Sequence, residues 1–183
     1  TDMPLVRRAA SKGKPLIMST GMASLSEIEQ AVSTAREAGC EQIILLKCTS
    51  TYPADPINTN LNTIPHLQQA FGVQVGLSDH TGGIGAAVAS VALGATVVEK
   101  HFVLDRNGGG VDAAFSLEPH ELKSLVTETE RAWQALGGVC YGGTQAEDKA
   151  KQYRRSIYVS KDIKPGEALG PHNLKIVRPA FGL

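Results

Sequence analysis

The sequence has few cysteines and no excess of charge of either sign. The three cysteines, Cys40, Cys48 and Cys140, are odd in number and widely spaced, so they form neither a disulfide framework nor a zinc motif. We therefore expect reduced thiols in a cytoplasmic protein. Lys plus Arg and Asp plus Glu each number 18. Because no block of like charge occurs, nucleic acid and anionic membranes are poor candidate partners.

The sequence also has no long apolar run and no dinucleotide-binding motif. No hydrophobic stretch approaches the roughly 18–20 residues of a membrane span, and the N-terminus is not typical of a signal peptide. No Gly-x-Gly-x-x-Gly follows a predicted strand, which removes support for a dinucleotide fold. The chain starts at Thr1 rather than Met, so we expect a fragment or a trimmed chain.

What the sequence does contain is a strand followed by a helix, four times in succession. The predicted strands are residues 15–18, 42–50, 73–80 and 96–102, and the predicted helices are residues 24–39, 63–72, 83–95 and 116–138. Ser24 and Glu27 have capping-box spacing, and Ser116 is the candidate N-cap of the last helix. Gly72 and Gly137 are expected helix stops.

Four such units predict an α/β fold with parallel strands joined by helical crossovers. Two architectures fit this pattern, an open doubly wound sheet and half of a (β/α)₈ barrel. In either one, the active site gathers at the carboxyl ends of the strands. All four ends are polar: residues 19–21, 47–50, 78–80 and 99–101. We therefore predict one polar rim.

Two histidines end adjacent predicted strands, and acidic residues flank them. The side chains of His80 and His101 converge if both occupy the first position of the rim. Neutral imidazole is the commonest protein ligand of divalent metals, and Asp79 and Glu99 could coordinate the metal or orient its ligands. The alternative is that each histidine only hydrogen-bonds within the rim, since neither H-x-x-x-H nor H-E-x-x-H is present.

Hydroxyl groups and lysines complete the predicted rim. With neighbouring backbone N–H groups, hydroxyls can hold a phosphate; the candidates are Ser19, Thr20, Ser50 and Ser78. Helix capping is an equally good interpretation for Ser19 and Thr20. A lysine inside such a barrel could form a Schiff base, but alternation along the strand directs Lys100 away from the interior, and Lys47 precedes the rim residues.

Several motifs together resemble one known family. "KPLIMSTGM", "LLKCTSTYP", "GLSDHT", "EKHF" and "RSIYVSKDIKPGE" occur in the order found in the sialic acid synthase, or nonulosonic acid synthase, family. "CTSTYP", "VDAAFSLEP" and "RPAFGL" are most similar to its pseudaminic acid synthase branch. The resemblance implies the C-terminal half of a (β/α)₈ TIM-type barrel at residues 1–137, a linker at 138–155 and the start of a small β-rich antifreeze-like (SAF) domain at 156–183.

The resemblance also implies a reaction. Phosphoenolpyruvate would condense with an open-chain amino-sugar aldehyde, a 2,4-diacetamido-2,4,6-trideoxy hexose, to give a nonulosonic acid and phosphate. A divalent metal, Mn²⁺ or Mg²⁺, would lie between His80 and His101. The remaining family positions are Ser19, Ser50 and Ser78 on the phosphate, and Tyr52, Glu99 and Asp112 near the acceptor sugar. Ser50 departs from the neuraminate branch, which tends to have Asn there.

The sequence lacks part of the family's barrel and also fits other functions. The resemblance also implies a homodimeric full-length parent. The family's first four barrel units, with a glutamate base and phosphate-binding lysines, are absent from the sequence, so we expect this chain to be inactive alone. The alternatives are an N-acetylneuraminate or legionaminate synthase, a 3-deoxy sugar acid synthase, and a non-catalytic barrel fragment. Phe115 could contact the acceptor's methyl group or pack into the base of the barrel.

Overall fold

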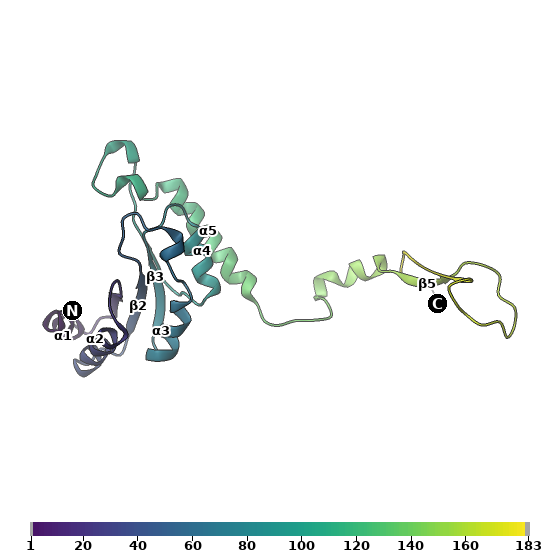
Figure 1. Ribbon diagram of the computed structural model, residues 1–183, viewed down its shortest axis with the longest axis horizontal. Helices are drawn as coiled ribbons and strands as arrows, with labels where there is room; N and C mark the ends of the chain where they lie inside the picture. Colours follow the sequence, from purple (N-terminus) through teal and green to yellow (C-terminus); the bar gives the residue numbers. More distant parts are fainter. Residues whose placement is uncertain (1, 182–183) are drawn as a thin grey trace. The chain divides into compact units, whose positions relative to one another are not determined.

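The computed structural model describes residues 2–181, and the chain divides into two compact units after Gly137 (Figure 1). The first unit contains a four-stranded parallel sheet with the strand order β1-β2-β3-β4. The strands are β1 Leu16–Ser19, β2 Ile43–Cys48, β3 Gln74–Asp79 and β4 Val98–Lys100. The sequential order, with a helix after each strand, is that of part of a TIM barrel. The predicted fold class is therefore confirmed.

The helices of this unit follow the predicted order, with one addition. They are α1 Met3–Ala10, α2 Leu25–Glu37, α3 Thr63–Phe71, α4 Gly85–Ala92 and α5 Pro119–Leu136. Helix α1, which the sequence analysis did not predict, packs against α2, and α4 lies beside α5 (Figure 1). Asp2 caps α1 by accepting a hydrogen bond from the Leu5 N–H.

Local capping chemistry explains where the helices begin and end. Ser24 and Glu27 form the predicted reciprocal capping box of α2, and Gly72 ends α3 in the left-handed conformation, with φ of 62°. The prediction that Ser116 caps the last helix is wrong. Glu118 is the N-cap, because Pro119 fits the first helical position, where no N–H is needed.

The two faces of the sheet have different roles. The residues that face the helices form the hydrophobic core with α2 and α3: Ile43, Leu45, Val75 and Leu77 pack with Val32, Ile64 and Leu67. The alternate residues form the opposite face, called here the inner face. Gly76 lies on it so close to the next strand that a Cβ atom there would be 2.2 Å from the Val97 carbonyl oxygen. The inner face leads directly to the strand ends that carry the candidate site.

Both outer strands of the sheet have an unpaired edge within residues 2–181, since β1 pairs only with β2 and β4 only with β3. Ile17, on the inner face of β1, is 52% exposed. Open edges and uncovered apolar surface favour pairing with other chains. We therefore expect the isolated chain to self-associate in sedimentation velocity experiments. A concentration-independent monomer that unfolds cooperatively would contradict this expectation.

The second unit contains a two-stranded antiparallel sheet of β5 Ser156–Val159 and β6 Leu174–Val177. A 3₁₀ helix, η4 Gln145–Tyr153, precedes it, within the predicted linker of residues 138–155. The buried Asn173 side chain donates to the Ala168 carbonyl oxygen and accepts from the Gly170 N–H. The last two residues of the RPAFGL motif lie outside the described residues. No helix between residues 2 and 181 has both the length and the hydrophobicity needed to cross a membrane.

Candidate active site

The structure brings the two predicted metal ligands together at the carboxyl ends of β3 and β4. His80 directly follows β3 and His101 directly follows β4, and their ring centroids are 5.2 Å apart. His80 is buried and His101 is partly exposed. Parallel pairing of the two strands places their ends at the same edge. Both histidines therefore occupy the first position of the rim, as their predicted convergence requires.

Hydrogen bonding fixes which nitrogen of His80 is available. Its Nδ1 lies 3.1 Å from the carbonyl oxygen of Thr49. Because a carbonyl oxygen can only accept, Nδ1 is the donor, and Nε2 is the ring nitrogen that this contact leaves for a metal ion. The Nδ1 of His101 lies 3.6 Å from Oδ2 of Asp112, so a carboxylate is close to this imidazole but not within hydrogen-bond distance. Carbonyl and carboxylate partners of this sort orient metal-ligating histidines, so this donor set fits a divalent cation.

Two aromatic rings surround the histidine pair. The Tyr52 ring centroid is 4.3 Å from that of His80 and 5.9 Å from that of His101. The Phe115 centroid is 5.1 Å from that of His101 and 6.1 Å from that of Tyr52. Phe115 therefore lies at the rim, and the alternative that it packs into the base of the barrel is wrong. The rim has an apolar wall beside its polar groups.

Ser78 and Glu99 form a contact between adjacent strands. They are register partners in β3 and β4, and the Ser78 hydroxyl donates to Oε1 of Glu99 over 2.6 Å. Ser78 is buried, whereas Glu99 is exposed. The hydroxyl proton of Ser78 is thus directed to a carboxylate in this state, and it must be redirected before Ser78 can donate to a phosphate.

The other predicted hydroxyls lie at the ends of β1 and β2. Ser50 approaches Gly21 so closely that a Cβ atom at Gly21 would be 2.1 Å from the Ser50 hydroxyl oxygen. Ser19 ends β1 and is exposed. The Thr20 hydroxyl donates to the Leu46 carbonyl oxygen over 3.0 Å. The interpretation of Ser19 and Thr20 as helix caps is wrong, because Ser24 caps α2.

Both rim lysines are engaged in contacts within the protein. Lys100 is directed at Asp79, on the opposite side of β4 from Glu99, as strand alternation predicted. Lys47 donates to the Cys48 carbonyl oxygen over 2.9 Å and to the Thr49 hydroxyl over 3.1 Å, and burial lowers the pKa of its ammonium group. These contacts hold both amines away from the histidine pair.

Sequence reasoning missed one feature of the inner face. The buried thiol of Cys48 lies 3.8 Å from Nδ1 of His80 and 3.5 Å from the Ser50 hydroxyl oxygen. In the sequence alone, Cys48 is only one of three widely spaced cysteines. Strand alternation was the available signal, because Cys48 is two residues from Ser50 and both therefore face the same side.

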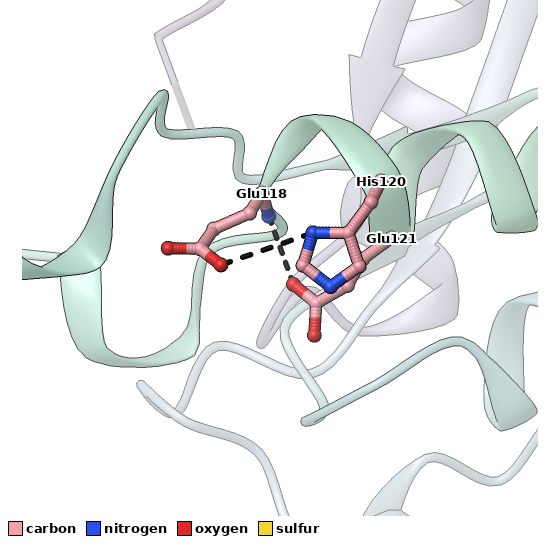
Figure 2. Close-up of side chains that lie close together, drawn as sticks. All are labelled: Glu118, His120 and Glu121. Atoms are coloured by element: carbon pink, nitrogen blue, oxygen red, sulfur yellow. Dashed lines mark hydrogen bonds and ion pairs between the residues drawn. The ribbon is translucent and has the colours of Figure 1, made fainter.

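A second group of possible metal ligands lies at the start of α5 (Figure 2). Ligand atoms of Glu118, His120 and Glu121 lie within 4.8 Å of one another, so this triad could hold a metal ion. Arg106 forms ion pairs with both carboxylates. A backbone hydrogen bond from Glu118 to Glu121 lowers the pKa of Glu121, and Arg106 contributes to the same shift. Helix capping and this arginine account for the cluster without a metal.

Residues 1–141 match the NeuB family, and residues 154–182 match the SAF domain. The chain belongs to the NeuB family. The N,N'-diacetyllegionaminic acid synthase of Campylobacter jejuni is 43% identical over 186 residues, covering 100% of this chain and 56% of that relative. The pseudaminic acid synthase of the same species is 43% identical over 182 residues, covering 100% and 53%.

A solved structure agrees with this family membership. The crystal structure of an N-acetylneuraminic acid (sialic acid) synthetase from Leptospira borgpetersenii, in complex with citrate, has a TM-score of 0.75 and 40% identity. The match covers 81% of this chain and 52% of that structure. This chain spans about half the length of the curated NeuB-family relatives that it matches.

Proposed function

We propose that the whole protein to which this chain belongs condenses phosphoenolpyruvate with an open-chain amino-sugar aldehyde, giving a nonulosonic acid and phosphate. The observation that carries this proposal is the pair of histidines at adjacent strand ends, 5.2 Å apart between ring centroids. The names of the relatives support it, since they are synthases of legionaminic and pseudaminic acids. In the proposed division, residues 1–137 supply half of the barrel, 138–155 a linker and 156–183 part of the SAF domain.

In this proposal His80 and His101 hold a divalent metal, Mn²⁺ or Mg²⁺, through their Nε2 atoms. Such a metal, when bound, polarises the aldehyde oxygen of the acceptor as a Lewis acid. Thr49 and Asp112 orient the two imidazoles through Nδ1. Tyr52, which contacts both rings, restricts the space in which an acceptor can lie and helps to exclude water.

The hydroxyls at the strand ends hold the phosphate of phosphoenolpyruvate in this scheme. Ser19, Ser50 and Ser78 lie at the ends of three consecutive strands. Ser78 donates to Glu99 in the unliganded arrangement, so phosphate binding would redirect this proton and release the Glu99 carboxylate toward the acceptor. Phosphate and acceptor subsites would thus be linked through one hydrogen bond.

The substrate test is phosphate release by the whole protein with two acceptors. We expect kcat/KM for the 2,4-diacetamido-2,4,6-trideoxy hexose to exceed that for N-acetylmannosamine by about 10–200-fold. A single methyl contact in an apolar pocket discriminates between substrates by about this factor. Phe115, beside His101, would provide the contact. Phe115→Ala should reduce the ratio of the two kcat/KM values. The control Phe71→Ala, in α3, should leave this ratio unchanged.

Three other results would change the proposal. Equal values, or a preference for N-acetylmannosamine, would move the protein to the neuraminate branch. Turnover of phosphorylated sugars would indicate a 3-deoxy sugar acid synthase. No phosphate release with any acceptor would favour a non-catalytic binding or assembly role. The proposed homodimer can be measured on the same sample by light scattering.

A further inference from the structure

A buried ion pair lies directly behind the two candidate metal ligands. Nζ of Lys100 is 2.8 Å from Oδ2 of Asp79, and the two side chains are only 3% and 0% exposed. Asp79 precedes His80 in the chain, and Lys100 precedes His101. The two charged residues are also register partners of β3 and β4. One side-chain contact therefore joins the two backbone positions from which both histidines project.

The same two side chains also bind the backbone beyond His80. Oδ1 of Asp79 accepts a hydrogen bond from the Thr81 N–H over 2.9 Å, and Nζ of Lys100 donates to the Thr81 carbonyl oxygen. In addition, the His80 carbonyl oxygen accepts a hydrogen bond from the Ala54 N–H over 2.9 Å. The backbone is thus held before, at and after His80.

The side chains of Asp79 and Lys100 cannot themselves contact a metal ion held by the two histidines. Side chains alternate between the faces of a strand. Ser78 and Glu99 meet on the inner face, so Asp79 and Lys100 occupy the helix face. Their near-complete burial agrees with this placement. Any effect of the pair on the candidate metal site must therefore pass through the backbone of residues 79–81 and 100–101.

We propose that the Asp79–Lys100 ion pair is a positioning device that sets the separation and orientation of His80 and His101 for metal binding. This inference rests on the proposed function of the histidine pair. Replacing a buried ion pair with apolar residues is often tolerated by a fold. Two apolar side chains would fill the same volume, but they would not hold Thr81 by its N–H and its carbonyl oxygen, and the end of β3 would be less restrained.

The test is the double variant Asp79→Asn/Lys100→Met in the whole protein. Both buried charges are removed together, and the amide oxygen at position 79 can still accept from the Thr81 N–H. We expect the affinity for Mn²⁺, measured by isothermal titration calorimetry, to fall about 10–100-fold, the usual effect of losing groups that orient metal ligands. The electron paramagnetic resonance spectrum of bound Mn²⁺ should change as well.

The matched control is Val32→Ala, which removes core volume in α2, where Val32 is 1% exposed. This variant should lower the melting temperature in chelator without changing Mn²⁺ affinity. Should the double variant fail to fold, Asp79→Asn/Lys100→Gln replaces it, because it also removes both buried charges but keeps a polar side chain at each position; the expected direction is the same. Unchanged Mn²⁺ affinity and spectrum in a folded variant would overturn the positioning role. Absence of Mn²⁺ binding by the wild type would instead overturn the proposed metal site itself, and the inference with it.

Discussion

His80→Ala and His101→Ala are each expected to lower kcat/KM of the whole protein by about 1,000-fold or more. A metal that stabilises developing charge lowers the activation free energy by several kcal/mol, and its loss raises the barrier by the same amount. Each 1.36 kcal/mol of barrier is a factor of ten in rate. Chelation of the wild type should have the same effect, and Mn²⁺ should restore activity. Steady-state phosphate release before and after dialysis against a chelator measures both effects.

The fold should survive these substitutions. His101 is only partly buried. Removing His80 leaves the Thr49 carbonyl oxygen without its donor, which costs about 1–3 kcal/mol. His120→Ala is the matched control, because it removes the histidine of the Glu118–His120–Glu121 triad (Figure 2) and should leave activity unchanged. Full activity of either rim variant in metal-free buffer would refute the assignment, and loss of activity in His120→Ala would move it to the triad.

Gly76→Ala is expected to produce the largest loss of stability of any single methyl addition to the sheet. The new Cβ atom would lie 2.2 Å from the Val97 carbonyl oxygen and 2.8 Å from Cδ2 of Leu46. The first of these neighbours is backbone and cannot rotate away. Overpacking of a core costs about 1–3 kcal/mol, and occasionally more, and here β3 would have to separate from β4. Urea unfolding followed by circular dichroism measures the loss.

A matched glycine separates this effect from the general cost of adding a methyl group. Gly85 is the first residue of α4, and a Cβ atom there would meet nothing within 4 Å. Gly85→Ala should therefore leave the midpoint of unfolding unchanged or raise it slightly, since alanine is favoured over glycine in a helix by about 1 kcal/mol. A Gly76→Ala midpoint within error of the Gly85→Ala midpoint would show that the sheet can adjust.

The order of elements was readable from the sequence because it depends on short-range patterns. The capping box of Ser24 and Glu27 and the left-handed Gly72 are local signals, and the structure has both. Helix α1 was missed because its eight residues make only about two turns, although Asp2 caps it and a proline lies in its first turn. Ser116 was misassigned because Glu118 provides a capping box of its own, an uncommon use of glutamate.

The candidate site was only partly readable for a different reason. Strand ends can be predicted from the sequence, and His80 and His101 do lie together. Side-chain partners across strands depend on register, which the sequence does not fix. The Ser78–Glu99 and Asp79–Lys100 contacts both follow from one register of β3 and β4, and a shift of one residue would remove both. Phe115 reaches the rim through a loop whose path no local pattern indicates.

The partner of His80 has a consequence for how this site tolerates sequence change. Its Nδ1 is held by the main-chain carbonyl of Thr49, and every amino acid supplies that oxygen. The side chain at position 49 can therefore vary without altering which imidazole nitrogen is protonated. Beside His101 the nearest carboxylate is a side chain, Asp112, with Oδ2 3.6 Å from Nδ1, and a single mutation can remove it. Mutation should therefore affect the two histidines unequally. The partner of His80 is kept as long as the path of the chain is kept, whereas the carboxylate beside His101 is kept only while position 112 remains acidic.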